Sequence, residues 1–272
     1  MKLDMGAAWS SATGMLSANK DVVLVVAGVF FFLPYLALTL LVPQAAQAAQ
    51  GQADPEAVMA MLADVYASHW WAFLLVSVAQ GIGMLALLAL LTDRRRPTVG
   101  EALGLGAKGF LPYLGSQLLV GLCFGVGIGV PVVAAAASGI GTLTLVLGAL
   151  AAVAGIYLFV KFSLIAQVIA IDGILNPLKV LPRSWRLTKG NSLRLFAFYF
   201  LIFIALGIAV LLITMVFGVV FALLGGQMEV LGNGIVGSVM NTVFVVIYLA
   251  VLAAVHRQLA GPSAEAMSET FE

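Results

Sequence analysis

The chain has 272 residues, of which 62% are hydrophobic and only 9% are charged. Soluble globular proteins carry about 25% charged residues, so this composition excludes a soluble domain and, with several apolar runs of about 20 residues, indicates an integral membrane protein. The net charge is +1, and the single cysteine, Cys123, excludes an intrachain disulfide.

The first third predicts one surface helix and two spans. Residues 3–17 are typical of a weakly amphipathic helix at a membrane interface. Residues 22–42 form a first span with a kink at Pro34, because proline interrupts the helical hydrogen bonds. A polar linker over 44–53 follows. A helix that begins near Asp54 then leads through the aromatic belt at His69 into a second span over 70–91.

The middle third predicts a second amphipathic helix over 98–110, a third span over 111–137 and a fourth over 142–160. Gly121 and Gly125 form a GxxxG pair, which favours close helix packing, with a pore lining or hinge as the alternative. Lys161 ends the fourth span. If the helix instead continues to Ile171, Lys161 lies inside the bilayer and must reach its edge or find a partner. We prefer the shorter span, with residues 162–171 as an interfacial or partly re-entrant continuation.

The last third predicts a fifth span within 192–224, an outer turn over 225–234 and a sixth span over 235–255. Residues 1–260 are therefore interpreted as a single six-span membrane domain. Residues 261–272 are interpreted as a short, disordered acidic tail.

The charges predict an orientation. In this topology all 13 lysines and arginines fall on one side of the membrane, while the other side carries only acidic residues, namely Asp54, Glu56, Asp64 and Glu229. This positive-inside pattern predicts a bacterial inner-membrane protein with both termini in the cytoplasm.

The order of elements also predicts an internal repeat over 3–91, 98–171 and 176–257. Each unit has a short cytoplasmic amphipathic helix followed by two spans. The expected fold class is therefore an all-α membrane protein whose six transmembrane helices form three hairpins.

Residues 176–191 form a cationic, tryptophan-bearing segment between two apolar runs. Asn176 and Pro177 predict a helix start, and Pro182 predicts a kink or restart. Leu178, Leu181 and Trp185 share one helical stripe. We expect contact with anionic lipid from Lys179, Arg183, Trp185, Arg186 and Lys189. The alternative is that these charges only satisfy the positive-inside rule.

Few polar groups lie at membrane depth. The best candidates for a polar interior are Gln80, Ser163, Gln167 and Asn241. The sequence shows no phosphate-binding loop, no HExxH and no CxxC, and His69 and His256 lie far apart. We therefore expect no catalytic residues, no cofactor and no metal.

The run Asp172-Gly173, Pro177 and Ser184-Trp185-Arg186-Leu187-Thr188-Lys189-Gly190-Asn191 resembles the glycerophosphoryl diester phosphodiesterase membrane-domain family and the YciC-type bacterial inner-membrane proteins. The resemblance is specific over about twenty residues and covers most of the chain in layout. It implies an integral bacterial membrane protein. The phosphodiesterase active site of such proteins belongs to a separate soluble domain, with metal-binding Glu, Asp and His, that this chain lacks, so the resemblance implies no catalysis.

These observations predict a non-enzymatic inner-membrane protein that binds or organises lipid, or that serves as an accessory subunit of a membrane complex. The expected partners are anionic lipid headgroups and, if the protein is an accessory subunit, another membrane protein, with no nucleic acid. The alternative function is a transporter or channel for a small or lipid-like solute, with a path lined by the polar interior residues.

Overall fold

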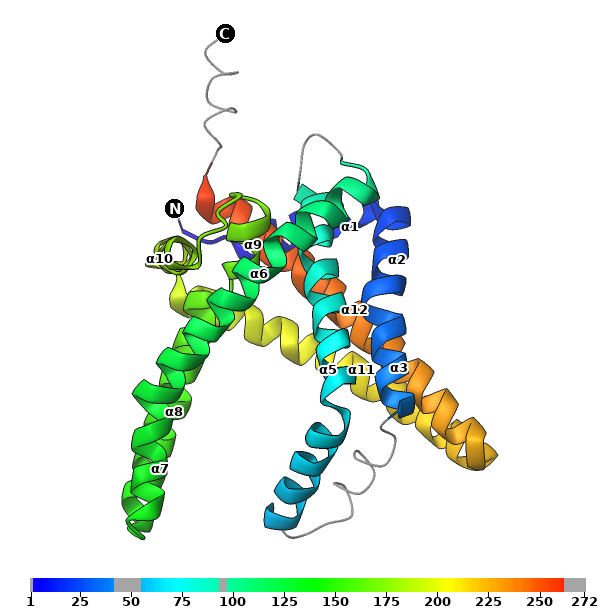
Figure 1. Ribbon diagram of the computed structural model, residues 1–272. Coiled ribbons are helices and arrows are strands. Elements are labelled where there is room, and N and C mark those ends of the chain that lie inside the picture. The colour runs from blue at the N-terminus through cyan, green and yellow to red at the C-terminus, as the bar shows by residue number, and fades with distance from the viewer. Residues whose placement is uncertain (1, 42–54, 93–96, 262–272) are drawn as a thin grey trace.

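The computed structural model describes residues 2–41, 55–92 and 97–261, and all regular structure in these ranges is helical (Figure 1). Six helical stretches are long and apolar enough to cross a membrane, which confirms the predicted class and number. They are Lys20–Leu41, Glu56–Thr92, Val99–Ala137, Gly141–Ala170, Ser192–Leu224 and Gly226–Ala260. The predicted linker over 44–53, the arginines at 94–96 and nearly all of the predicted tail over 261–272 lie outside the described residues.

The elements follow one another in chain order. They are α1 (Met5–Ala18), α2 (Lys20–Ala27), the π-helix η1 (Gly28–Phe32), α3 (Leu33–Leu41), α5 (Pro55–Thr92), α6 (Val99–Phe124), the π-helix η2 (Gly125–Gly129), α7 (Val130–Ala137), α8 (Gly141–Phe162), α9 (Ile165–Ala170), α10 (Pro177–Thr188), α11 (Ser192–Leu224) and α12 (Gly226–Ala260).

Two irregularities interrupt the first two spans, and the first of them falls at the kink that the sequence predicted. The π-helix η1 immediately precedes the segment that holds Pro34, whose ring would clash with the carbonyl of Phe30 in a regular α-helix. A wider turn at this point relieves that clash. In α5, the backbone leaves helical geometry at His69, with φ −120° and ψ 21°, at the predicted point of entry into the membrane.

Two predicted boundaries were wrong. The amphipathic helix over 98–110 and the first half of the third span are one continuous helix, α6, which runs through Pro112 and is followed directly by η2 and α7. Thr98 starts it with a reciprocal capping box to Glu101. The outer turn over 225–234 is also much shorter than predicted. Gly225 and Gly226 take positive φ values of 65° and 58°, and α12 begins at once.

The glycine packing also differs from the prediction. A Cβ atom added at Gly121 or Gly125 would meet nothing within 4 Å, so the GxxxG pair makes no close helix contact within the described chain. The close approach is instead at Gly106 of α6, where an added Cβ would lie 2.5 Å from the carbonyl oxygen of Ile82 in α5. A small residue at Gly106 therefore allows α5 and α6 to pack closely.

The buried core lies at one end of the molecule. It joins the last turns of α5 (85–91), nearly all of α9, the first turns of α11 and the stretch 249–256 of α12. Toward the other end, α7 and α8 extend together in one direction and the outer parts of α11 and α12 in another (Figure 1). Their side chains are widely exposed there, for example Leu145 at 75% and Leu223 at 84%.

The short helix α9 is part of this core. The sequence predicted residues 162–171 as an interfacial or partly re-entrant continuation of the fourth span. The structure instead buries Ile165, Gln167, Val168 and Ile169 among α5, α6, α10 and α12. The chain turns at Ser163 and Leu164, which ends α8 one residue after Lys161.

Candidate functional site

The candidate site is built around α10, which lies at the core end of the molecule together with α1 and the end of α12 (Figure 1). Asn176 starts the helix by accepting a hydrogen bond of 2.9 Å from the backbone N–H of Leu178, and Pro177 occupies the first turn. The helix runs through Pro182 to Thr188, so the predicted restart does not occur. Gly190, with φ +82°, ends the segment and leads into α11.

Three faces of α10 meet different surroundings. The face toward the protein is buried and consists of Val180, Ser184, Leu187 and Thr188. The stripe predicted as apolar is exposed at its start, where Leu178 is 70% exposed, whereas Leu181 packs against the core and Trp185 contacts Tyr157 and Phe162. On the third face Lys179 and Arg186 are exposed, as is Lys189 just beyond the helix. Of the five residues predicted to bind lipid, these three lysine and arginine side chains are therefore the exposed ones.

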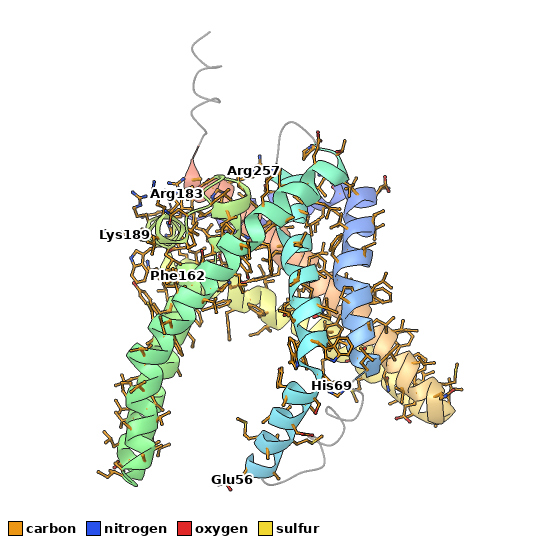
Figure 2. All side chains as sticks on the ribbon, in the orientation of Figure 1. Glu56, His69, Phe162, Arg183, Lys189 and Arg257 are labelled. Atoms are coloured by element: carbon orange, nitrogen blue, oxygen red, sulfur yellow. The ribbon has the colours of Figure 1, made fainter. Side chains whose placement is uncertain are left out.

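Lys161 links α10 to the end of α8. Its backbone carbonyl accepts a hydrogen bond of 2.8 Å from Ser184 Oγ, and Thr188 Oγ1 donates to the Ser184 carbonyl at 3.1 Å. The Lys161 ammonium lies 5.3 Å from the ring centre of Tyr157 and 5.1 Å from that of Trp185. These two rings meet edge to face at 5.7 Å. Phe162 and Lys189 mark this junction in Figure 2.

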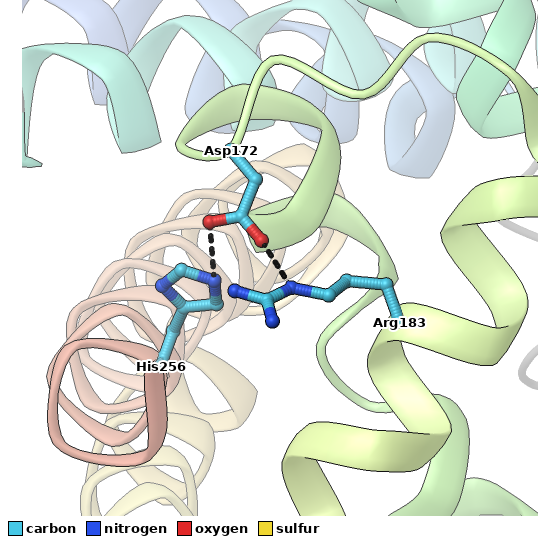
Figure 3. Close-up of polar contacts among 3 residues, drawn as sticks. All are labelled: Asp172, Arg183 and His256. Atoms are coloured by element: carbon cyan, nitrogen blue, oxygen red, sulfur yellow. Dashed lines mark hydrogen bonds and ion pairs between the residues drawn. The ribbon is translucent and has the colours of Figure 1, made fainter. Parts of the chain in front are cut away.

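Asp172 links α10 to α12. Arg183 Nε donates to Asp172 Oδ2 at 2.8 Å, and His256 Nε2 lies 3.1 Å from Asp172 Oδ1 (Figure 3). Partial burial would raise the pKa of Asp172, but the contacts from His256 and Arg183 outweigh it and hold that pKa below its ordinary value. Arg183, predicted as a lipid contact, therefore serves first as an internal ion-pair partner.

The N-terminus closes the same end of the molecule. The buried backbone N–H of Leu3 donates to Asn191 Oδ1 at 2.9 Å. The backbone N–H of Asp4 donates to Gln258 Oε1 at 3.2 Å, and Gln258 Nε2 donates back to the Asp4 carbonyl at 3.1 Å. These bonds hold α1 against α12 and fix the turn between α10 and α11.

The predicted polar interior is not assembled as a site. Gln80 and Asn241 are half-buried, and Ser163 shares a hydrogen bond of 3.1 Å with the Tyr199 hydroxyl. Gln167 is fully buried, and its side-chain amide has no hydrogen-bond partner within the described chain. No hydrogen bond joins these four predicted residues to one another. A pocket of about 280 Å³ between α8 and α11 has an apolar lining that includes Phe159, Tyr199 and Phe203.

Sequence reasoning missed Asp172 as an ion-pair partner, His256 as a contact of Asp172, and Ser184 and Thr188 as attachments of α10. The Asp172 contact to His256 could not be found from spacing, because the two residues lie on elements far apart in the chain. The i, i+4 spacing of Ser184 and Thr188 on one helical face was the available signal. In the part of the chain that the structure describes, no group of three His, Cys, Asp or Glu side chains is placed to hold a metal ion.

Comparison with known proteins gives one family. Residues 3–259 match the model of the family described as a domain of unknown function, DUF7847. No curated protein and no solved structure matches the chain. Because the family match spans nearly the whole chain, this protein belongs to the DUF7847 family.

Proposed function

We propose that this protein is a non-enzymatic, multi-pass protein of the bacterial inner membrane that binds anionic lipid through α10 and so organises lipid locally or supports a membrane complex. The observation that carries the proposal is that α10 exposes its basic face together with Leu178, the first residue of its apolar stripe. Leu178 on the apolar stripe is 70% exposed, while Lys179 and Arg186 are exposed on the basic face. A helix at a lipid interface covers one such face with hydrocarbon and the other with headgroups.

The distribution of charge supports the proposed orientation. Arg183, Lys189 and Arg257 lie at one end of the molecule, and Glu56 lies at the other (Figure 2). An end with lysine and arginine is retained in the cytoplasm during insertion, and each basic side chain near an anionic leaflet contributes about 1 kcal/mol. We place both termini and α10 on the cytoplasmic side for this reason.

We keep the arrangement of three hairpins as part of this proposal. In this interpretation α1, the start of α6 and α10 each lead into a pair of spans. The closest contact between α5 and α6 crosses the boundary between the first two proposed repeats. The repeats would therefore interlock rather than fold as separate units.

We also keep the proposed kinship to the glycerophosphoryl diester phosphodiesterase membrane-domain family and the YciC-type proteins, and the structure suggests a physical reason for the shared motif. Ser184 and Thr188 attach α10 through their hydroxyls, Leu187 is buried, and Gly190 supplies a positive φ. Asn191 then accepts from Leu3. A motif that attaches a surface helix to the core would be useful to any protein that holds such a helix at the membrane.

The alternative function, a transporter or channel, has no comparable support in the described residues. Its proposed lining residues do not contact one another through hydrogen bonds, and the pocket between α8 and α11 is apolar. We therefore do not propose it.

A charge-matched pair of variants tests the proposed function. The first variant replaces Lys179, Arg186 and Lys189 with Gln, and the control replaces Lys20, Lys108 and Arg257 with Gln, so both lose three positive charges. Native mass spectrometry of each purified protein would count retained phosphatidylglycerol and phosphatidylethanolamine. We expect the first variant alone to lose phosphatidylglycerol, with phosphatidylethanolamine unchanged. Equal retention of phosphatidylglycerol by both variants would contradict the proposal.

A further inference from the structure

Lys161 is a buried cation without a negative partner. The residue is only 2% exposed, although it lies at the end of an apolar helix. Its ammonium makes no ion pair and no hydrogen bond with the described residues, and its contacts are the rings of Tyr157 and Trp185. The carboxylate nearest in the chain, Asp172, is instead engaged by Arg183 and His256.

This environment favours an anion. A buried ammonium has three N–H donors, and burial without partners is unfavourable, because the lost hydration must be replaced. The faces of the Tyr157 and Trp185 rings replace part of the lost hydration, but they accept no conventional hydrogen bond. Lys189 follows Thr188, whose Oγ1 lies 3.5 Å from the Lys161 carbonyl oxygen, so the charge of Lys189 adds to the positive potential at this junction. The junction of α8 and α10 therefore has an excess of positive charge that an anion would balance.

The location indicates the class of anion. Lys161 is the penultimate residue of a membrane-spanning helix, which places it at the depth of lipid phosphates, and tryptophan and tyrosine are typical of that depth. Below it, an exposed apolar stripe follows α8 at helical spacing through Tyr157, Val153, Leu150 and Val146. From Tyr157 to Val146 this stripe is about 16 Å long. A single leaflet of hydrocarbon is about 15 Å deep, so one acyl chain can lie along it.

We propose that Lys161 and Lys189 together bind the phosphate of one anionic phospholipid, whose acyl chain lies along the exposed stripe of α8. This inference rests on the proposed function and makes it more specific, because it assigns one tightly held lipid to one junction. Tyr157 is 46% exposed and Trp185 is partly exposed, so rotation of either ring opens a path to the ammonium. In this proposal the Trp185 side chain lines the site and rotates when the lipid headgroup enters.

The test uses the full chain, purified with its native lipids, and four variants. Lys161→Met removes the charge but keeps the length of the side chain, and Lys161→Arg keeps the charge. Lys189→Gln removes the second proposed contact from an exposed position, where folding is not at risk. Lys108→Gln is the matched control, since Lys108 is an exposed lysine at the same end of the molecule.

Native mass spectrometry at rising collision energy would measure the last lipid retained. We expect wild type, Lys161→Arg and Lys108→Gln to keep one phosphatidylglycerol after all other lipids are lost. Lys161→Met is expected to reduce this last occupancy about tenfold and Lys189→Gln about fivefold, as expected for the loss of one charged contact. Undiminished retention by Lys189→Gln and by folded Lys161→Met would overturn the inference.

Two further comparisons distinguish a lipid from inorganic phosphate as the ligand, and failure of the Lys161 site from failure of the proposed function. Adding inorganic phosphate to delipidated protein is expected to leave its thermal unfolding unchanged, whereas vesicles of phosphatidylglycerol raise the midpoint. Stabilisation by inorganic phosphate that depends on Lys161 would overturn the assignment to a lipid. If the three-residue variant of α10 loses phosphatidylglycerol while Lys161→Met keeps it, the Lys161 site fails and the proposed function stands. If neither variant loses phosphatidylglycerol, both the Lys161 site and the proposed function are contradicted.

Discussion

Asn191 Oδ1 accepts a buried hydrogen bond of 2.9 Å from the backbone N–H of Leu3, a residue 188 positions earlier in the chain. The bond joins the N-terminal segment to the turn between α10 and α11. Two segments that are far apart in the chain are in this way held at one site.

Replacing Asn191 with Ala is expected to lower the free energy of unfolding by about 1–3 kcal/mol, because the buried N–H of Leu3 would lose its acceptor. Thermal unfolding in detergent measures this change. Ser17→Ala is the control, since Ser17 is exposed and its substitution should change stability by less than about 0.5 kcal/mol. Equal midpoints for Asn191→Ala and the control would show that the bond contributes nothing.

Asp172→Asn is expected to destabilise the protein by about 1–2 kcal/mol at neutral pH, between the values for exposed and buried ion pairs. The pKa of Asp172 in the folded protein is below its ordinary value of 3.8. A carboxyl group of this kind stabilises the fold above its unfolded pKa and loses that contribution as pH falls through its folded pKa.

The difference in unfolding midpoint between wild type and Asp172→Asn should therefore be constant above about pH 5 and should shrink below pH 3.8. Unfolding scans between pH 3 and pH 7 would show this. Asp21→Asn, at an exposed position, serves as the control. A difference that grows toward acid pH would contradict the assigned direction of the shift.

Gly106→Ala is expected to destabilise the fold by about 1–3 kcal/mol, because its Cβ would lie 2.5 Å from the Ile82 carbonyl oxygen, and backbone atoms cannot move aside easily. Gly104→Ala, on the same helix, would meet nothing within 4 Å. Because alanine favours a helix by about 1 kcal/mol over glycine, this second change should stabilise. Opposite shifts of the unfolding midpoint are the expected result, and shifts of the same sign would contradict the α5–α6 contact.

Single-cysteine labelling tests the orientation. In a background that replaces Cys123 with Ser, Lys108→Cys should react with a membrane-impermeant maleimide only after the inner membrane is permeabilised. Glu229→Cys, at the opposite end, should react from the periplasmic side while that membrane is intact. Lys108 is exposed and Glu229 is partly exposed, so a maleimide can reach both positions. Labelling of Lys108→Cys across an intact inner membrane would invert the proposed topology.

The sequence predicted the helical class and the six spans because hydropathy over about 20 residues depends on composition alone. The irregularity at Pro34 was predicted because local chemistry causes it, whereas the break at His69 was not predicted, although it falls at the predicted aromatic belt. The start of α12 was predicted too late in the chain, because that prediction also depended on local composition. Gly232 and its neighbours have the composition of a loop, but the helix continues there because Gly232 leaves room for the ring of Phe221 on α11.

The candidate site was predicted only in part. The basic residues and Trp185 were selected as candidates because charge and aromatic belts are local signals, and their contact with lipid stays a prediction. The attachment of α10 was not found, since the Asp172 contact to His256 and the Asn191 contact to Leu3 depend on tertiary packing. The same packing gives Arg183 an internal partner and leaves Lys161 without one, a contrast that charge patterns alone cannot reveal.

The pairing of α1 with α12 has a consequence for biosynthesis. The backbone N–H groups of Leu3 and Asp4 are paired with Asn191 and Gln258, and Gln258 is synthesised 254 residues after Asp4. At about 5–20 residues per second, the first helix waits roughly ten seconds or more before its permanent neighbour exists. Until then its contact face, with Ala8 and Ala12, has to be sheltered by the bilayer surface or by a chaperone.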